Sequence, residues 1–520
     1  MTANPQNGMT SGGLVLRALR RWGDRVAFSG HGGSVTYAQA LDLVGRYQAA
    51  MTEAGAKRGD RLALLNANRA DAWLAGMAAQ ALGLCATPLH PMGSADDQAF
   101  ILEDAGIDFL LVDVDGHGER GGALSKGNNR LRRTFTLGPA DYGLDLTAAA
   151  EAAGAVTAVD QAQPGDFAWL AYTGGTTGKS KGVLRRHASN VAVTTANLAE
   201  FEWPAESTFL AVAPISHVAG TKLAPILLRG GRVHLQNGFD PEAVLRTIAE
   251  QRISVALLVP TMIYLLLDHP KLGDTDLSSL DLLMYGTSPM SPGRLLEALE
   301  RIGPVFCQLY GQTEGYPISV LRKGDHDAAA ADLFASCGHP VSSMAVALLD
   351  EDDQPVKDGE AGEICARGPQ VMDEYWRRPE QTEETLAKGW LHTGDMAWRD
   401  DRGYLYIVDR KKDMIVSGGF NVFPREVEDV LAAHPDVAMA AVIGVPDEKW
   451  GEAVKAVVVP KAGAKLDTQA LIERVKASKG PVHAPKSVDV VDAIPLTAIG
   501  KPDKKVLRER YWQGQSRRVG

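Results

Sequence analysis

The feature that most constrains the fold is a regular alternation of strand-like and helix-like segments that begins near residue 60. Short apolar runs such as RLALLNA, DFLLVDV, FLAVAP, SVALLVP and LLMYG are typical of buried strands. Between them lie longer amphipathic runs, and several follow residues that start helices well, among them Ser94, Asp240 and Ser291. Strands that alternate with helices of this length indicate parallel sheets covered on both faces. We therefore predict an α/β fold.

The pattern of apolar and polar residues changes near residue 340, where short strands of alternating residues indicate a smaller β-rich subdomain. Beyond the charged run DRKKD, a helix after Pro424, two strands and a helix capped by Asp467 form a compact α+β cluster. A chain of 520 residues exceeds one hydrophobic core, so several domains are expected. We predict a large N-terminal domain over residues 1–411 and a small C-terminal domain over residues 412–520.

A glycine-rich loop, YTGGTTGKSKG, spans residues 172–182 and follows the strand-like run DFAWLAY. Glycines let successive backbone N–H groups converge on one point, hydroxyls add donors, and the two lysines supply positive charge. This composition predicts a site for a polyphosphate.

The loop nearly matches the Walker A pattern of P-loop ATPases, since Gly178, Lys179 and Ser180 fall in register. Thr173 stands where that pattern requires its first glycine, and the chain runs on into VLRR and not into a helix. The run 346–351, VALLDE, resembles a Walker B strand but leads into the acidic turn DEDDQP. We therefore reject the P-loop ATPase interpretation.

Four more motifs accompany this loop: YGQTEG at 310–315, HTGD at 392–395, DRKKD at 409–413 and PLTAIGK at 495–501. In this order and with these gaps, the chain resembles the adenylate-forming superfamily of acyl-CoA synthetases, peptide-synthetase adenylation domains and beetle luciferases. The resemblance spans nearly the whole chain. It implies that a carboxylic acid and ATP give an acyl adenylate and pyrophosphate, and that a thiol then displaces AMP.

The resemblance also implies which residues bind ATP, in the glycine-rich loop, around the adenine and at the ribose. They are Thr173, Gly174, Gly175, Thr176, Thr177, Lys181, Gly286, Thr287, Ser288, Tyr310, Asp395 and Arg410. Thr313 and Glu314 match the contacts to the α-phosphate and Mg²⁺, and a carboxylate beside phosphate oxygens suits a hard cation.

Further residues take catalytic or conformational roles by the same resemblance. Lys501 matches the lysine that contacts the carboxylate and the α-phosphate, and His217 matches a position between the acyl pocket and that carboxylate. Lys412 falls at the hinge about which the family rotates its mobile C-terminal domain, and Gly418 and Gly419 match the tunnel of the coenzyme A thiol.

The expected acyl pocket is formed by Ala219, Leu223, Gln308 and Gly315. Plant hydroxycinnamate ligases carry a tyrosine and a serine in the segment that here contains Ala219 and Leu223. The pocket of this chain is therefore expected to be roomier and less polar there. The segment 216–220, SHVAG, lacks the aspartate with which amino-acid-activating domains bind the α-ammonium group. We therefore expect a fatty acid or a bulky aromatic or alicyclic acid.

Composition excludes several other classes. A formal net charge of −10 and a pI near 5.7 argue against a nucleic-acid binder. Four scattered cysteines form no C-x-x-C pair, which disfavours a disulfide framework or a structural zinc site. The first residues, MTANPQNGMTSGG, show neither the basic nor the apolar region of a signal peptide, and the sequence has no apolar run of 18 residues, so we expect no leader and no membrane span. We expect a cytoplasmic protein, and a homodimer is one open option.

The favoured function is an acid–CoA ligase of fatty acid metabolism, with ATP, Mg²⁺ and coenzyme A as the small molecules it uses. The alternative is an adenylating enzyme that loads an acyl carrier protein. Luciferase chemistry shares every motif and needs a light assay to exclude it. A non-catalytic ATP-binding protein would have lost Glu314, Asp395 or Lys501, and all three are present.

Overall fold

The computed structural model describes residues 8–30, 32–173, 180–417, 420–447, 450–461, 463–496 and 502–512. The chain forms two compact units, which we call the large unit (residues 1–346 and 366–391) and the small unit (residues 347–365 and 392–520). The β-rich segment after residue 392 thus clusters with the C-terminal part of the chain. The domain boundary expected at residues 411 and 412 stays a prediction.

The large unit contains a nine-stranded sheet whose central strands are all parallel, with antiparallel strands at both edges. In spatial order its strands are β16 (His339–Pro340), β15 (Gly315–Leu321), β14 (Phe306–Gln312), β13 (Leu282–Gly286), β12 (Val255–Leu258), β10 (Thr208–Ala211), β11 (Arg232–Leu235), β1 (Val26–Gly30) and β2 (Gly33–Thr36).

An eight-stranded sheet completes the large unit, and it too is parallel except at the edge formed by β8, β9 and β19. Its strands in order are β19 (Glu374–Tyr375), β9 (Lys181–Arg186), β8 (Phe167–Thr173), β4 (Cys85–Pro88), β3 (Arg61–Leu65), β5 (Phe109–Asp113), β6 (Arg133–Leu137) and β7 (Leu144–Asp145). The predicted α/β class with parallel sheets is therefore confirmed.

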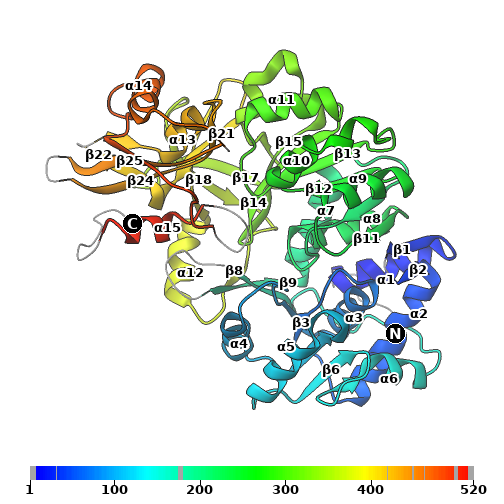
Figure 1. Cartoon of the computed structure of the whole chain (residues 1–520). Helices are drawn as coiled ribbons and strands as arrows, with labels where there is room; N and C mark the ends of the chain where they lie inside the picture. Colours follow the sequence, from blue (N-terminus) through cyan, green and yellow to red (C-terminus); the bar gives the residue numbers. More distant parts are fainter. Residues whose placement is uncertain are drawn as a thin grey trace. The chain divides into compact units, whose positions relative to one another are not determined.

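Helices connect these strands (Figure 1). They are α1 (Ser11–Trp22), α2 (Tyr37–Glu53), α3 (Ala70–Ala81), α4 (Ala95–Asp104), α5 (Val114–Gly127), α6 (Leu146–Ala152), α7 (His187–Glu200), α8 (Leu223–Leu228), α9 (Pro241–Glu250), α10 (Pro260–Leu267), α11 (Pro292–Arg301) and α12 (Pro379–Thr385). Two predicted caps are present, since the side chain of Ser94 accepts a hydrogen bond from Asp97 N and that of Asp240 accepts one from Ala243 N.

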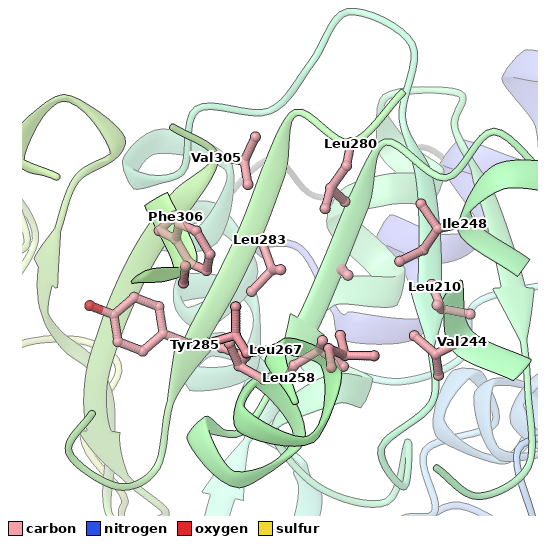
Figure 2. Packing of buried hydrophobic residues seen from close by; sticks show 14 of the residues in the cluster. Leu210, Val244, Ile248, Leu258, Leu267, Leu280, Leu283, Tyr285, Val305 and Phe306 are labelled. Carbon is pink, nitrogen blue, oxygen red and sulfur yellow. The ribbon is translucent and has the colours of Figure 1, made fainter. Parts of the chain in front are cut away.

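A hydrophobic core fixes the nine-stranded sheet against its helices, and Figure 2 shows how helix and strand side chains meet there. Val244 and Ile248 of α9 and Leu267 of α10 face apolar residues of four neighbouring strands. Those strand residues are Leu210 in β10, Leu258 in β12, Leu283 and Tyr285 in β13, and Phe306 in β14. Burial of this apolar surface holds β13 and the start of β14 against the helices.

The small unit contains most of a four-stranded sheet and a second sheet of five strands. The first sheet runs β17 (Ala345–Leu349), β18 (Gly362–Arg367), β20 (Leu391–Arg399) and β21 (Leu405–Arg410). The second has β23 (Phe420–Val422), β22 (Ile415–Ser417), β25 (Gly451–Pro460), β24 (Val437–Asp447) and β26 (Ser487–Val490), and its helices are α13 (Pro424–Ala432), α14 (Thr468–Lys479) and α15 (Lys504–Glu509). The predicted α+β character of the C-terminal part is confirmed.

Asp467 caps α14 as expected, because its side chain accepts hydrogen bonds from the N–H groups of Gln469 and Ala470. Within the described ranges, no helix combines the length and the apolar composition that a bilayer span requires.

Candidate active site

The glycine-rich loop joins two antiparallel strands of the eight-stranded sheet. Thr173 ends β8 and lies opposite Lys181, which begins β9. Gly174, Gly175, Thr176 and Thr177 lie outside the described residues. Because the chain continues after Ser180 as a strand and not as a helix, the Walker A interpretation is wrong for this loop, as the sequence indicated.

Thr313 and Glu314 form the turn between β14 and β15. The carboxylate of Glu314 is only 9% exposed and accepts a hydrogen bond of 2.7 Å from the hydroxyl of Tyr375. The guanidinium of Arg185 donates to the carbonyl oxygen of Thr313. Burial lowers the pKa of Arg185 to about 10, and the nearby carboxylate of Glu314 partly offsets this shift. The turn is thus fixed by one buried cation and one phenol.

Tyr375 links this turn to the glycine-rich loop. β19 pairs with β9, which places Tyr375 opposite Val183. The ammonium of Lys181 lies 5.0 Å from the centroid of the Tyr375 ring, a cation–π distance. Burial and the carboxylate of Glu314 raise the pKa of Tyr375, so the phenol stays a hydrogen-bond donor.

Sequence reasoning missed both Arg185 and Tyr375. Arg185 belongs to the run VLRR, whose sequence does not show that this residue is buried, and Tyr375 carries no local pattern.

The residues expected around adenine lie at the carboxyl ends of neighbouring parallel strands. Gly286 ends β13, Thr287 and Ser288 follow it, and Tyr310 lies near the end of β14. A Cβ at Gly286 would lie 2.3 Å from the carbonyl oxygen of Leu309, so only glycine permits this approach of the two strands. In open α/β sheets, ligands bind outside the carboxyl ends of the strands. The fold thus brings these four residues and the turn with Glu314 to one edge.

His217 follows β10 at the same edge of the sheet. Its ring lies edge-on to that of His90, with centroids 4.6 Å apart, and its Nδ1 is 2.8 Å from the hydroxyl of Ser216. The residue as a whole is exposed. Partial desolvation and the proximity of His90 lower the pKa of His217, which favours a neutral imidazole near pH 7.

The expected acyl-pocket residues come from two segments. Ala219 lies in the 3₁₀-helix η1 (Val218–Lys222) and Leu223 begins α8, and both are buried. Gln308 lies in β14, where its Oε1 is 3.3 Å from the hydroxyl of Tyr285, and Gly315 begins β15.

A buried lysine, which sequence reasoning missed, joins these two segments. The ammonium of Lys222 contacts the side-chain oxygen of Asn197 and the hydroxyl of Tyr316, and it lies 4.2 Å from the ring centroid of Phe201. Burial lowers the pKa of Lys222 well below its ordinary value. Because Tyr316 follows Gly315 directly, Lys222 fixes the distance between the 217–223 segment and β15.

In the small unit, Asp395 and Arg410 lie directly opposite each other across β20 and β21. Arg410 Nε is 2.6 Å from Asp395 Oδ1, and the carboxylate is buried while the guanidinium is half-exposed. Lys412 lies in the short 3₁₀-helix η6 (Lys411–Asp413), and its side chain is not described. Gly418, Gly419 and Lys501 lie outside the described residues.

Comparisons with known proteins identify the family. Residues 15–376 match the AMP-binding enzyme family, and residues 426–501 match the AMP-binding enzyme C-terminal domain. The chain is 46% identical to the medium/long-chain-fatty-acid–CoA ligase FadD8 of Mycobacterium tuberculosis, over 98% of this chain and 91% of that protein. It is 37% identical to a feruloyl-CoA synthase of an Amycolatopsis species, over 92% of this chain and 95% of that protein. The structure is similar to the amide bond synthetase McbA of Marinactinospora thermotolerans, with a TM-score of 0.89 and 35% sequence identity. The match covers 96% of this chain and 99% of the McbA chain.

Proposed function

The chain belongs to the AMP-binding enzyme family and is an acid–CoA ligase, and we propose that its acid is a fatty acid or a bulky aromatic or alicyclic acid. In the first step a carboxylate oxygen attacks the α-phosphorus of ATP, and pyrophosphate leaves. In the second step the thiol of coenzyme A attacks the acyl carbon, and AMP leaves. The observation that carries the proposed acid is the buried, apolar surface of Ala219 and Leu223. The buried carboxylate of Glu314, oriented at the sheet edge next to Lys181 through Tyr375, supports the adenylating step.

In the large unit, Glu314 and Thr313 would hold Mg²⁺. Their side chains offer only oxygen ligands, which this hard cation prefers, and the hydrogen bond from Tyr375 already orients the carboxylate. When bound, Mg²⁺ would neutralise charge on the triphosphate. Thr173 and Lys181 would contact the same phosphates from the ends of β8 and β9, and Tyr310 would stack on adenine.

In the small unit, Asp395 and Arg410 would bind the ribose. A carboxylate offers two acceptor oxygens to two vicinal hydroxyls, and the ion pair with Arg410 holds Asp395 in place. The roles of Lys501 in adenylation, of Lys412 as a hinge, and of Gly418 and Gly419 in thiol access stay proposals that rest on the sequence resemblance.

The proposed acid follows from the residues around Ala219 and from the relatives. Ala219 and Leu223 present apolar, buried surface, and no carboxylate lies within the segment 216–220 that could bind an α-ammonium group. The relatives named above act on a fatty acid and on ferulate, both acids with largely apolar bodies. The cytoplasmic location expected from the sequence stays a proposal, and a homodimer stays an open option.

The test is pyrophosphate release from ATP across a panel of fatty, phenylpropenoic and alicyclic acids, with and without coenzyme A. We expect AMP and pyrophosphate only when an acid is present, and acyl-CoA only when coenzyme A is added. Formation of ADP, or turnover without any acid, would contradict the adenylating mechanism.

The same assay separates the acceptors. A holo acyl carrier protein replaces coenzyme A in one arm, and an amine replaces it in another, because the structurally similar McbA is named an amide bond synthetase. Faster acyl transfer to either acceptor than to coenzyme A would contradict the ligase assignment while leaving adenylation intact.

A further inference from the structure

A cluster of three metal-ligating side chains lies in the small unit, outside the residues assigned above. Glu363 and Cys365 are two residues apart on β18, so their side chains share one face of the sheet. His392 comes from the neighbouring strand β20. One ligand atom from each residue lies within 4.8 Å of the other two, and both Glu363 and Cys365 are buried.

The spacing of these atoms suits a single tetrahedral cation. His392 Nδ1 lies 3.4 Å from Cys365 Sγ and 3.4 Å from Glu363 Oε2. Metal–ligand bonds of about 2.0–2.3 Å at tetrahedral angles place neighbouring ligand atoms roughly 3.3–3.6 Å apart. A thiol, an imidazole and a carboxylate together suit Zn²⁺ and similar thiophilic cations, whereas Mg²⁺ and Ca²⁺ prefer oxygen ligands alone.

The surroundings also resemble the supporting contacts of a metal site. The second oxygen of Glu363 accepts a hydrogen bond of 2.9 Å from the N–H of Gly394, which orients the carboxylate. The other ring nitrogen of His392, Nε2, is buried without a hydrogen-bond partner among the described residues, and it lies 3.8 Å from a carboxylate oxygen of Asp353. A metal-bound histidine commonly directs its second nitrogen to such a carboxylate.

One side chain competes with a cation for this position. The ammonium of Lys411 lies 3.2 Å from Glu363 Oε2, and its side chain is 46% exposed. A long, half-exposed lysine can move into water at little cost, since such ion pairs contribute little to stability. A bound cation would replace this ammonium on Glu363 and would displace the thiol proton of Cys365 into solvent.

We propose that Glu363, Cys365 and His392 form a binding site for a thiophilic divalent cation of the Zn²⁺ type, and that its occupation weakens ATP binding. The second part rests on the proposed function, because His392 and Gly394 belong to the same strand segment as Asp395, the proposed ribose ligand. A cation held by His392 and by Glu363, which accepts the hydrogen bond from Gly394, would couple its binding to the position of that segment.

The binding experiment uses Co²⁺ as a spectroscopic probe and Zn²⁺ as its competitor. We expect one equivalent of Co²⁺ per chain, with a thiolate-to-cobalt absorption band and intense visible bands of tetrahedral Co²⁺, all abolished by one equivalent of Zn²⁺. Cys365→Ser and His392→Gln should each weaken binding by at least about 10- to 100-fold, since each removes a ligand and the loss of an outer-shell partner alone costs that much. Cys337→Ser, at another buried cysteine, is the matched control and should keep the band.

Lys411→Met gives an independent test that does not disturb the buried ligands. Removal of the competing ammonium should tighten Co²⁺ binding about two- to fivefold. This factor corresponds to the free energy that one half-exposed ion pair contributes. The proposal is overturned by a thiolate band that survives Cys365→Ser, by the absence of that band, or by unchanged affinity in Lys411→Met.

The functional part is measured as the KM for ATP in pyrophosphate release, with and without one equivalent of Zn²⁺ at fixed excess Mg²⁺. We expect Zn²⁺ to raise this KM in the wild type and not in Cys365→Ser, each compared with its own zinc-free value. An equal effect of Zn²⁺ in both proteins would refute the regulation. If the zinc-free wild type releases no pyrophosphate with any acid, the proposed function fails, while the Co²⁺ titration still decides the metal site.

Discussion

Tyr375→Phe isolates the hydrogen bond that orients the proposed magnesium ligand. The substitution removes only the hydroxyl, which donates to Glu314 Oε1 over 2.7 Å in a buried setting. The ring remains, so the contact with the ammonium of Lys181 is kept. A change therefore reports on the partners of this hydroxyl, Glu314 and Thr385, and not on the glycine-rich loop.

The magnitude follows from the charge of the acceptor. A hydrogen bond to a charged group contributes about 1.5–3 kcal/mol. Without it, the carboxylate must be ordered when the cation binds, so the Mg²⁺ concentration at half-maximal rate should rise by up to roughly 10- to 150-fold. The rate at saturating Mg²⁺ should fall much less. The free energy of unfolding should fall within the same range, because the buried carboxylate loses its donor.

The assay is pyrophosphate release as a function of free Mg²⁺, at saturating ATP and acid, together with urea unfolding. Glu314→Gln should also raise the Mg²⁺ requirement while leaving the fold intact. The double variant should be non-additive, because both changes remove the same interaction. Tyr37→Phe is the control: it removes a buried hydroxyl that donates to the carbonyl oxygen of Gly231 and should lower stability without changing the Mg²⁺ dependence.

An unchanged Mg²⁺ dependence in Tyr375→Phe would refute the reasoning, and so would an equal shift in Tyr37→Phe. In the first case Glu314 does not bind the metal through an oriented carboxylate. In the second case the shift reflects a general loss of stability.

Three further predictions concern the ribose site, the acyl pocket and the response to acid. Asp395→Asn should raise the KM for ATP at least about tenfold, since it removes a charged acceptor worth about 1.5–3 kcal/mol; an unchanged KM would place the ribose elsewhere. Ala219→Tyr should shift preference toward smaller acids, because overfilling a packed site costs roughly 1–3 kcal/mol, and an unchanged acid profile would contradict this. Burial lowers the pKa of His326 to about 4, so the unfolded chain binds a proton below pH 6.5 that the folded chain does not. Stability should therefore fall as the pH falls from 6.5 toward 4, and between pH 7 and 5 the wild type should lose about 2 kcal/mol more than His326→Asn in urea unfolding; equal losses would contradict this.

The sequence predicted the fold well where the signals are local. The strand and helix alternation, the caps at Ser94, Asp240 and Asp467, and the lack of a helix directly after Ser180 all follow from residues within a few positions of each other. At Ser291 the helix begins as predicted, yet the side chain makes no capping hydrogen bond, so the proline at the first turn is sufficient. Local patterns are therefore reliable for starts of helices, even where the expected contact is absent.

The residues that the sequence could not predict act through pairings between distant segments. Tyr375 reaches Glu314 because the short strand β19 adds to the edge of the eight-stranded sheet beside β9. Arg185 reaches Thr313 because it is buried within β9 and points toward the turn of a different sheet in the same unit. No residue composition and no spacing in the sequence predicts either contact. They emerge only once the order of the strands is known.

The expected acyl-pocket segment also contains a polar group that residue types alone did not reveal. Ala219 and Leu223 are four positions apart and would share a face in an α-helix, which favours the apolar interpretation of this segment. The structure has a 3₁₀-helix over Val218–Lys222, in which residues three apart are aligned. Lys222 therefore lies on the side of Ala219, and its buried amine with Tyr316 gives the region a polar group that the apolar pattern hides. An acid that carries a hydrogen-bonding group on its apolar body is thus compatible with this site as well as a simple fatty acid, which is why the substrate panel must contain both kinds.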